Sequence, residues 1–86
     1  MKTLIVLFYM LNGNLVSYTV SEYGAFQQEA RIDAARPCEA AIGNKDFIES
    51  VRKGLAEGES MKAECYRSDD LMTLGEPYKS VTISRQ

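Results

Sequence analysis

The two cysteines are the residues of this chain whose type and spacing suggest the most specific chemistry. Cys38 lies near the start of a predicted helix, and Cys65 lies near the end of the strand predicted to follow it. When a strand packs on the helix before it, these two ends lie in adjacent layers, so the pair is a candidate disulfide. Such a bridge would stabilise the fold by about 3–4 kcal/mol in the chain-entropy model and would indicate an oxidising compartment. The alternative is two buried reduced thiols that pack as small apolar side chains.

Apart from the cysteines, the sequence gives little indication of catalytic or metal-binding groups. The chain contains no histidine, which removes Ser-His-Asp and Cys-His arrangements, and two cysteines alone cannot form a structural zinc site. The spacing of Asp69, Asp70 and Glu76 does not match a calcium-binding loop, and we expect Asp69 or Asp70 to cap a short turn over residues 71–74. We therefore predict that the chain is not an enzyme and has no catalytic, cofactor-binding or metal-ligating residues.

The elements that must position the cysteines begin with an apolar run over residues 3–11. Asn12-Gly13 separates this run from a second one, and an Asn-Gly pair between apolar runs is a strong signal for a β-hairpin, here over residues 3–20. The alternative is a cleavable secretory signal, because Lys2 supplies a positive start, although no small-residue cleavage pattern follows. The hairpin interpretation favours a cytoplasmic protein, and export stays open.

The two runs of the hairpin differ in their patterning. The first run does not alternate between apolar and polar residues, so we expect a central strand that is covered on both faces. In the second run Val16, Tyr18 and Val20 alternate with more polar residues, which is typical of a strand with one face in water.

The rest of the chain predicts an α+β fold. An amphipathic pattern indicates one main helix over about residues 38–57, which Gly43-Asn44 can interrupt, with Asn44 capping a second segment. Alternation predicts a strand over residues 60–67 and an edge strand over residues 78–84. Residues 24–35 fit a strand and a helix equally well. We thus expect a small antiparallel sheet packed against one main helix.

Size and charge limit the classes of partner. The 86 residues are 45% hydrophobic and have a formal net charge of −2, which predicts one folded domain over residues 1–86. Because no basic surface or long apolar segment is evident, we expect neither a nucleic-acid nor a membrane partner. The edge strand at residues 78–84 predicts pairing with a second copy or with another protein.

Several short segments resemble a pattern found in short uncharacterised proteins of bacteria and their phages. The matching segments are Cys38-Glu39-Ala40-Ala41, Gly54-Leu55, Gly58 and Ala63-Glu64-Cys65. The resemblance covers the layout of residues 1–67 and implies a hairpin, a Cys-led helix and a Cys-ended strand; this chain departs from it at residues 24–36 and after Arg67. It implies no activity and lends slight support to the disulfide.

Two functions follow from these observations. The first is a small non-catalytic binding or regulatory module that dimerises through an edge strand. The alternative is an exported, disulfide-stapled protein with a ligand or inhibitor role.

Overall fold

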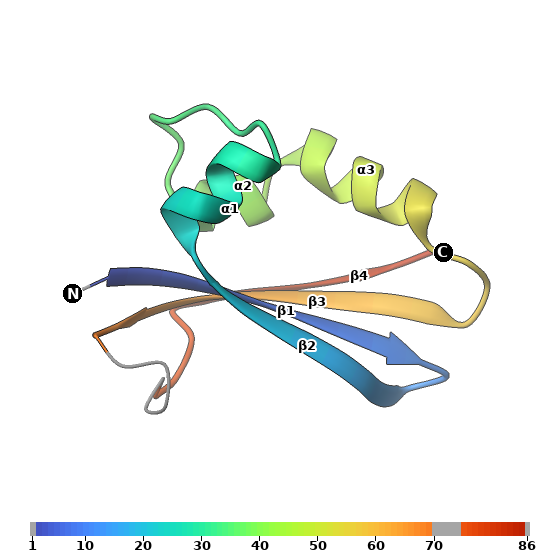
Figure 1. The fold of residues 1–86 in the computed structure, drawn as a ribbon. Coiled ribbons are helices and arrows are strands. Elements are labelled where there is room, and N and C mark those ends of the chain that lie inside the picture. Colours follow the sequence, from blue (N-terminus) through green and yellow to red (C-terminus); the bar gives the residue numbers. More distant parts are fainter. Residues whose placement is uncertain (1, 70–74, 86) are drawn as a thin grey trace.

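A computed structural model describes residues 2–69 and 75–85 of the chain. Its elements, in chain order, are β1 (Lys2–Leu11), β2 (Asn14–Glu22), α1 (Tyr23–Glu29), α2 (Cys38–Ile42), α3 (Lys45–Gly54), β3 (Glu59–Ser68) and β4 (Lys79–Ser84). The strands form one antiparallel sheet in the order β2-β1-β3-β4, and the helices lie on one of its faces (Figure 1). The predicted α+β fold, with its hairpin, third strand and edge strand, is confirmed.

The hairpin turn has the backbone that the Asn-Gly pair predicts. Asn12 and Gly13 both have positive φ, at 51° and 83°, as a tight two-residue hairpin turn requires. The Asn12 amide donates a hydrogen bond of 2.8 Å to the carbonyl oxygen of Gly58, in the loop before β3. A Cβ atom at Gly58 would lie 2.6 Å from the Asn12 side chain, and Gly58 itself has a φ of 84°. The positive φ favours glycine at position 58, and a larger residue there would also displace the Asn12 side chain.

Strand β1 occupies the centre of the sheet, as its sequence predicts, because it pairs with β2 on one side and β3 on the other. The expected cover on both faces holds only for its first half. Leu4, Ile5 and Val6 are buried, whereas residues 7–10 are half-buried. The helices cover one face, and residues 75–78 run along the opposite side near the start of β1 (Figure 1). The end of β1 at the hairpin turn therefore lacks full cover on the side without helices.

The single main helix predicted over residues 38–57 is in fact two helices. Gly43 lies between α2 and α3, and the Asn44 side-chain oxygen caps α3 by accepting hydrogen bonds from the amides of Asp46 and Phe47, at 2.9 and 3.3 Å. Helix α3 ends at Gly54 rather than at residue 57, because Leu55 has an extended backbone and its side chain is buried. The interruption foreseen at Gly43-Asn44 is thus present, and the C-terminal boundary was predicted three residues too late.

Residues 24–35, which the sequence left open between strand and helix, begin with α1 (Tyr23–Glu29). Tyr23 and Phe26 are three residues apart and both pack against the core on the helix side of the sheet. A helix places residues at this spacing on one face, whereas a strand would place them on opposite faces. The Tyr23 hydroxyl also donates a hydrogen bond of 2.6 Å to the carbonyl oxygen of Arg36. The short turn predicted over residues 71–74 lies outside the described residues.

The main core lies between the helices and the sheet, and it contains the two cysteines. Its buried members are Ile5, Tyr23, Cys38, Ala41, Ile42, Ala63 and Cys65. The structure joins Cys38, the first residue of α2, to Cys65 in the middle of β3, with a distance of 6.1 Å between their Cα atoms. The bridge links the helical layer to the sheet, in the strand-on-helix arrangement expected from the sequence.

Candidate functional site

The disulfide cannot act on a substrate, because it is enclosed by the core. Cys38 and Cys65 are only 1% and 0% exposed. Within residues 2–69 and 75–85, no cluster of three or more potential ligand side chains could hold a metal ion. In the same ranges no helix has the length and apolar character needed to cross a membrane. The remaining candidates for a functional surface lie on the exterior of the sheet.

The face of the sheet that carries no helices, here called the outer face, is defined by alternate residues of the paired strands. Its members are Leu4, Val6, Phe8, Tyr18, Val20, Lys62, Glu64, Tyr66, Ser80 and Thr82. The predicted alternation of β3, which groups Lys62, Glu64 and Tyr66, matches the pairing register. Near the start of β1 this face is closed by a small cluster in which Leu4, Val6 and Tyr66 are buried.

Glu64 is the most buried charged residue of the outer face, with 6% of its surface exposed. Its carboxylate accepts hydrogen bonds from the Tyr66 hydroxyl at 2.7 Å and the Ser80 hydroxyl at 3.2 Å, and Lys62 Nζ lies 3.4 Å away. Burial, and then the hydrogen bond to Glu64, raise the pKa of Tyr66 to about 12. Because these donors surround the carboxylate, the cluster stabilises the pairing of β3 with β4 and does not present a reactive group.

Toward the hairpin turn, the outer face becomes apolar and open. Leu15, Val16 and Tyr18 expose 57%, 56% and 63% of their surfaces. The register pairs Tyr9 with Ser17 and Met10 with Leu15, so Val16 is an extra residue without a partner in β1. Bulges of this kind are common at sheet edges and bend the strand locally. We call Leu15, Val16 and Tyr18 the hairpin patch.

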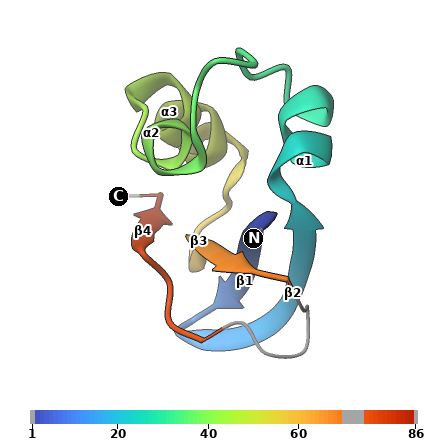
Figure 2. The ribbon, with the colours of Figure 1, turned by 90° about the vertical axis from the view of Figure 1, so that its left-hand side faces the viewer.

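The hairpin patch belongs to β2, which forms one edge of the sheet (Figure 2). Strand β2 is nine residues long and pairs with β1 along one edge. None of the described residues pairs with its other, free edge. Its residues 14–21 contain neither a charged side chain nor a proline. The one charged residue of the strand, Glu22, lies at its end in an ion pair of 2.8 Å with Lys2. Edge strands are usually protected by charge, proline or shortness, and only the bulge at Val16 serves that purpose here.

The opposite edge of the sheet, β4, has the protection that β2 lacks. It contains six residues, with Lys79 at its start and Arg85 directly after its end. Arg52 of α3 donates a hydrogen bond of 3.1 Å from Nε to the carbonyl oxygen of Ser84. The predicted edge strand at residues 78–84 is thus present, but the less protected edge is β2. Its freedom from charge over residues 14–21 is visible in the sequence; its edge position is not, because that depends on the pairing of β1 with β3.

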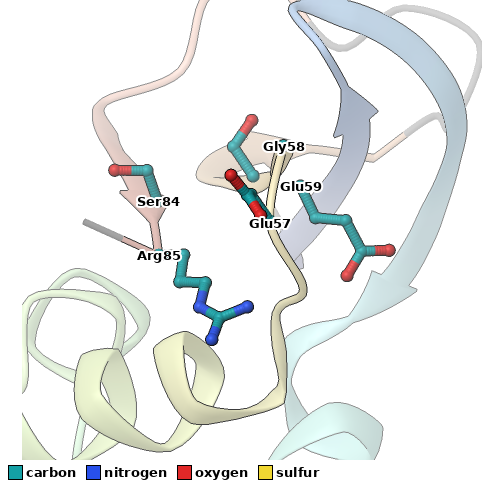
Figure 3. A pocket seen from close by; sticks show the side chains of 6 residues that line it. Glu57, Gly58, Glu59, Ser84 and Arg85 are labelled. Carbon is teal, nitrogen blue, oxygen red and sulfur yellow. The ribbon is translucent and has the colours of Figure 1, made fainter.

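A hollow of about 510 Å³ lies where β3 begins and β4 ends (Figure 3). It is lined by Glu57, Glu59 and Arg85 with small polar neighbours. Glu59 points away from the side occupied by Ser84 and Arg85, and its carboxylate accepts hydrogen bonds from the Tyr9 hydroxyl and, at 2.5 Å, from the Ala56 amide. The hollow is therefore open, mixed in charge and without a set of groups that converge on a ligand.

Comparisons with models of protein families, with curated proteins and with solved structures find no match for this chain. The resemblance to short bacterial and phage proteins stays a prediction. Two features of the described surface remain as candidates for a function, the β2 edge and the hairpin patch that it carries.

Proposed function

We propose that this domain is a non-catalytic protein-binding module that accepts an extended segment of a partner as an added strand along β2. The observation that carries the proposal is the length of this edge, nine residues, together with the absence of charge over residues 14–21. An unprotected edge offers backbone N–H and C=O groups for pairing, and neighbouring side chains supply selectivity. The hairpin patch supplies such side chains, because Leu15, Val16 and Tyr18 lie on the edge strand itself.

The non-catalytic part of the proposal is supported by the state of the reactive groups. The cysteine sulfurs are bonded to each other in the core, and Glu64 is surrounded by hydroxyl and ammonium donors. Catalytic groups need a cleft in which they can reach a substrate. The exposed surface of this domain is instead distinguished by an extended, uncharged edge that carries the hairpin patch, which suits binding to a protein.

The Cys38–Cys65 bond also supports a second candidate, an exported protein with a ligand or inhibitor role. Mass spectrometry of the protein isolated from its natural source separates the candidates. An intact N-terminus with two reduced thiols would count against export, whereas a mass lower by two hydrogens would support it. Residues 2–11 form β1, one of the two central strands of the sheet.

The strand-addition proposal can be tested with a defined peptide and NMR spectroscopy. The isotope-labelled protein would be titrated with a short soluble peptide of alternating threonine and valine with a lysine at each end. We expect chemical-shift changes along the β2 backbone and slower hydrogen exchange of those β2 amides that point outward. The control peptide has every second backbone nitrogen methylated and cannot form the ladder. Equal effects of the two peptides, or changes confined to β4, would contradict the proposal.

A further inference from the structure

Building on the proposed function, we infer that the partner strand at the β2 edge is β2 of a second copy of this chain, paired antiparallel about a two-fold axis at Tyr18. A symmetric dimer requires a surface that is complementary to itself. Strand β2 meets this requirement, because its uncharged residues 14–21 can lie beside the same residues of another copy without bringing like charges together.

The position of the axis follows from the geometry of antiparallel pairing. Residues directly opposite each other point to the same face of a sheet, and a two-fold axis perpendicular to the sheet keeps both outer faces on the same side. The axis must then pass between a residue and its own copy. Tyr18 is the midpoint of β2 (Asn14–Glu22), with four residues on each side, so an axis at Tyr18 gives the two strands their longest overlap, although the bulge at Val16 interrupts regular pairing at residues 14 and 15. Any other centre shortens this overlap.

The side chains favour the same register. An axis at Tyr18 places the two Tyr18 rings opposite each other on the outer face, and it places Val20, which is on the same face, opposite Val16 of the second copy. Apolar and aromatic cross-strand pairs of this kind stabilise sheets. Moving the axis to Thr19 or Val20 would instead place Glu22 opposite Val16 or Tyr18, respectively. The Tyr18 register thus gives Tyr18 an aromatic partner and Val16 an apolar one, and it places Leu15 opposite Ser21.

Neighbouring elements leave room for this arrangement. Helix α1 follows β2 at Glu22 and lies on the helix side of the sheet, so it does not extend across the free edge of β2 (Figure 2). The dimer would be a continuous eight-stranded sheet with the helices of both copies on one face. Its other face would bring the two hairpin patches together around the axis.

The experiment combines a measurement of mass with two lysine variants. Sedimentation of the full chain over a concentration series should show a monomer–dimer equilibrium. Tyr18→Lys places two ammonium groups opposite each other and should weaken dimerisation by about tenfold or more, because like charges directly opposite across strands repel. The matched control, Ser84→Lys, adds the same charge to the β4 edge and should leave dimerisation unchanged. Circular dichroism checks that each variant is folded, and Val16→Lys replaces Tyr18→Lys should the latter fail to fold.

The register has its own readout. In Tyr18→Cys, gentle oxidation should yield a covalent dimer whose new bond joins the two introduced cysteines, as peptide mapping would show. Tyr78→Cys, which lies away from β2, is the control and should remain uncrosslinked under the same conditions. A dimer that is insensitive to Tyr18→Lys, or that crosslinks no faster at Tyr18→Cys than at Tyr78→Cys, would overturn the inference. A strict monomer at millimolar concentration would also overturn it, and the peptide titration would then decide separately whether β2 accepts other strands.

Discussion

The two faces of the sheet are stabilised in different ways. On the helix side, Ile5, Ala63 and Cys65 pack against three helices, and a disulfide joins the layers. On the outer face, a small apolar cluster lies near the start of β1, a polar network surrounds the buried Glu64 in the middle, and the hairpin patch is exposed. The larger apolar core and the disulfide therefore lie on one face, and the hairpin patch on the β2 edge stays exposed.

The largest effect should come from removing the disulfide on the helix side. The double variant Cys38→Ala with Cys65→Ala should lose about 3–4 kcal/mol of unfolding free energy, because the bridge closes a loop that constrains the unfolded chain. Urea denaturation of the variant and of the reduced wild-type protein would measure the loss. If the double variant and the reduced protein were as stable as the oxidised protein, the disulfide would not stabilise the helix side. The proposed difference in stability between the two faces would then be smaller.

A smaller loss is expected when the polar network of the outer face is broken. Glu64→Ala leaves the hydroxyls of Tyr66 and Ser80 without their acceptor, which should cost about 1–3 kcal/mol. Glu64→Gln is the matched control, because its amide oxygen can still accept a hydrogen bond, and it should lose less. Chemical denaturation of both variants tests this order. Equal stability of Glu64→Ala and the wild type would show that the network contributes nothing to the outer face.

The smallest effect concerns the dependence of outer-face stability on pH. Burial and Glu64 raise the pKa of Tyr66 to about 12, above the ordinary value of 10.0. The folded state therefore retains this proton in a range where the unfolded state releases it. The contribution of Tyr66 to stability is complete below pH 10 and declines as the pH rises toward about 12. Tyr66→Phe should have a shallower decline than the wild type in denaturation curves measured across this range; identical slopes would exclude a role for Tyr66.

The amino-acid sequence by itself determined the features that depend on neighbouring residues. Asn12-Gly13 specifies the hairpin turn because both positions adopt positive φ, and the alternation of Lys62, Glu64 and Tyr66 specifies one face of β3. The break between α2 and α3 was also foreseen, since Asn44 can cap a helix with its own side chain. Each of these depends on backbone preference or on hydrogen bonds that span a few residues.

Only the tertiary structure decided what depends on distant segments. The sequence of residues 24–35 suits a strand and a helix equally well, and residues 23–29 form a helix because Tyr23 and Phe26 both pack against the core. The Glu64 network needs Ser80, which β4 brings opposite from the far end of the chain. The exposure of β2 likewise follows from the pairing of β1 with β3, which leaves β2 at the edge. Packing and strand order arise from contacts between segments far apart in sequence, and local residue patterns do not encode them one segment at a time.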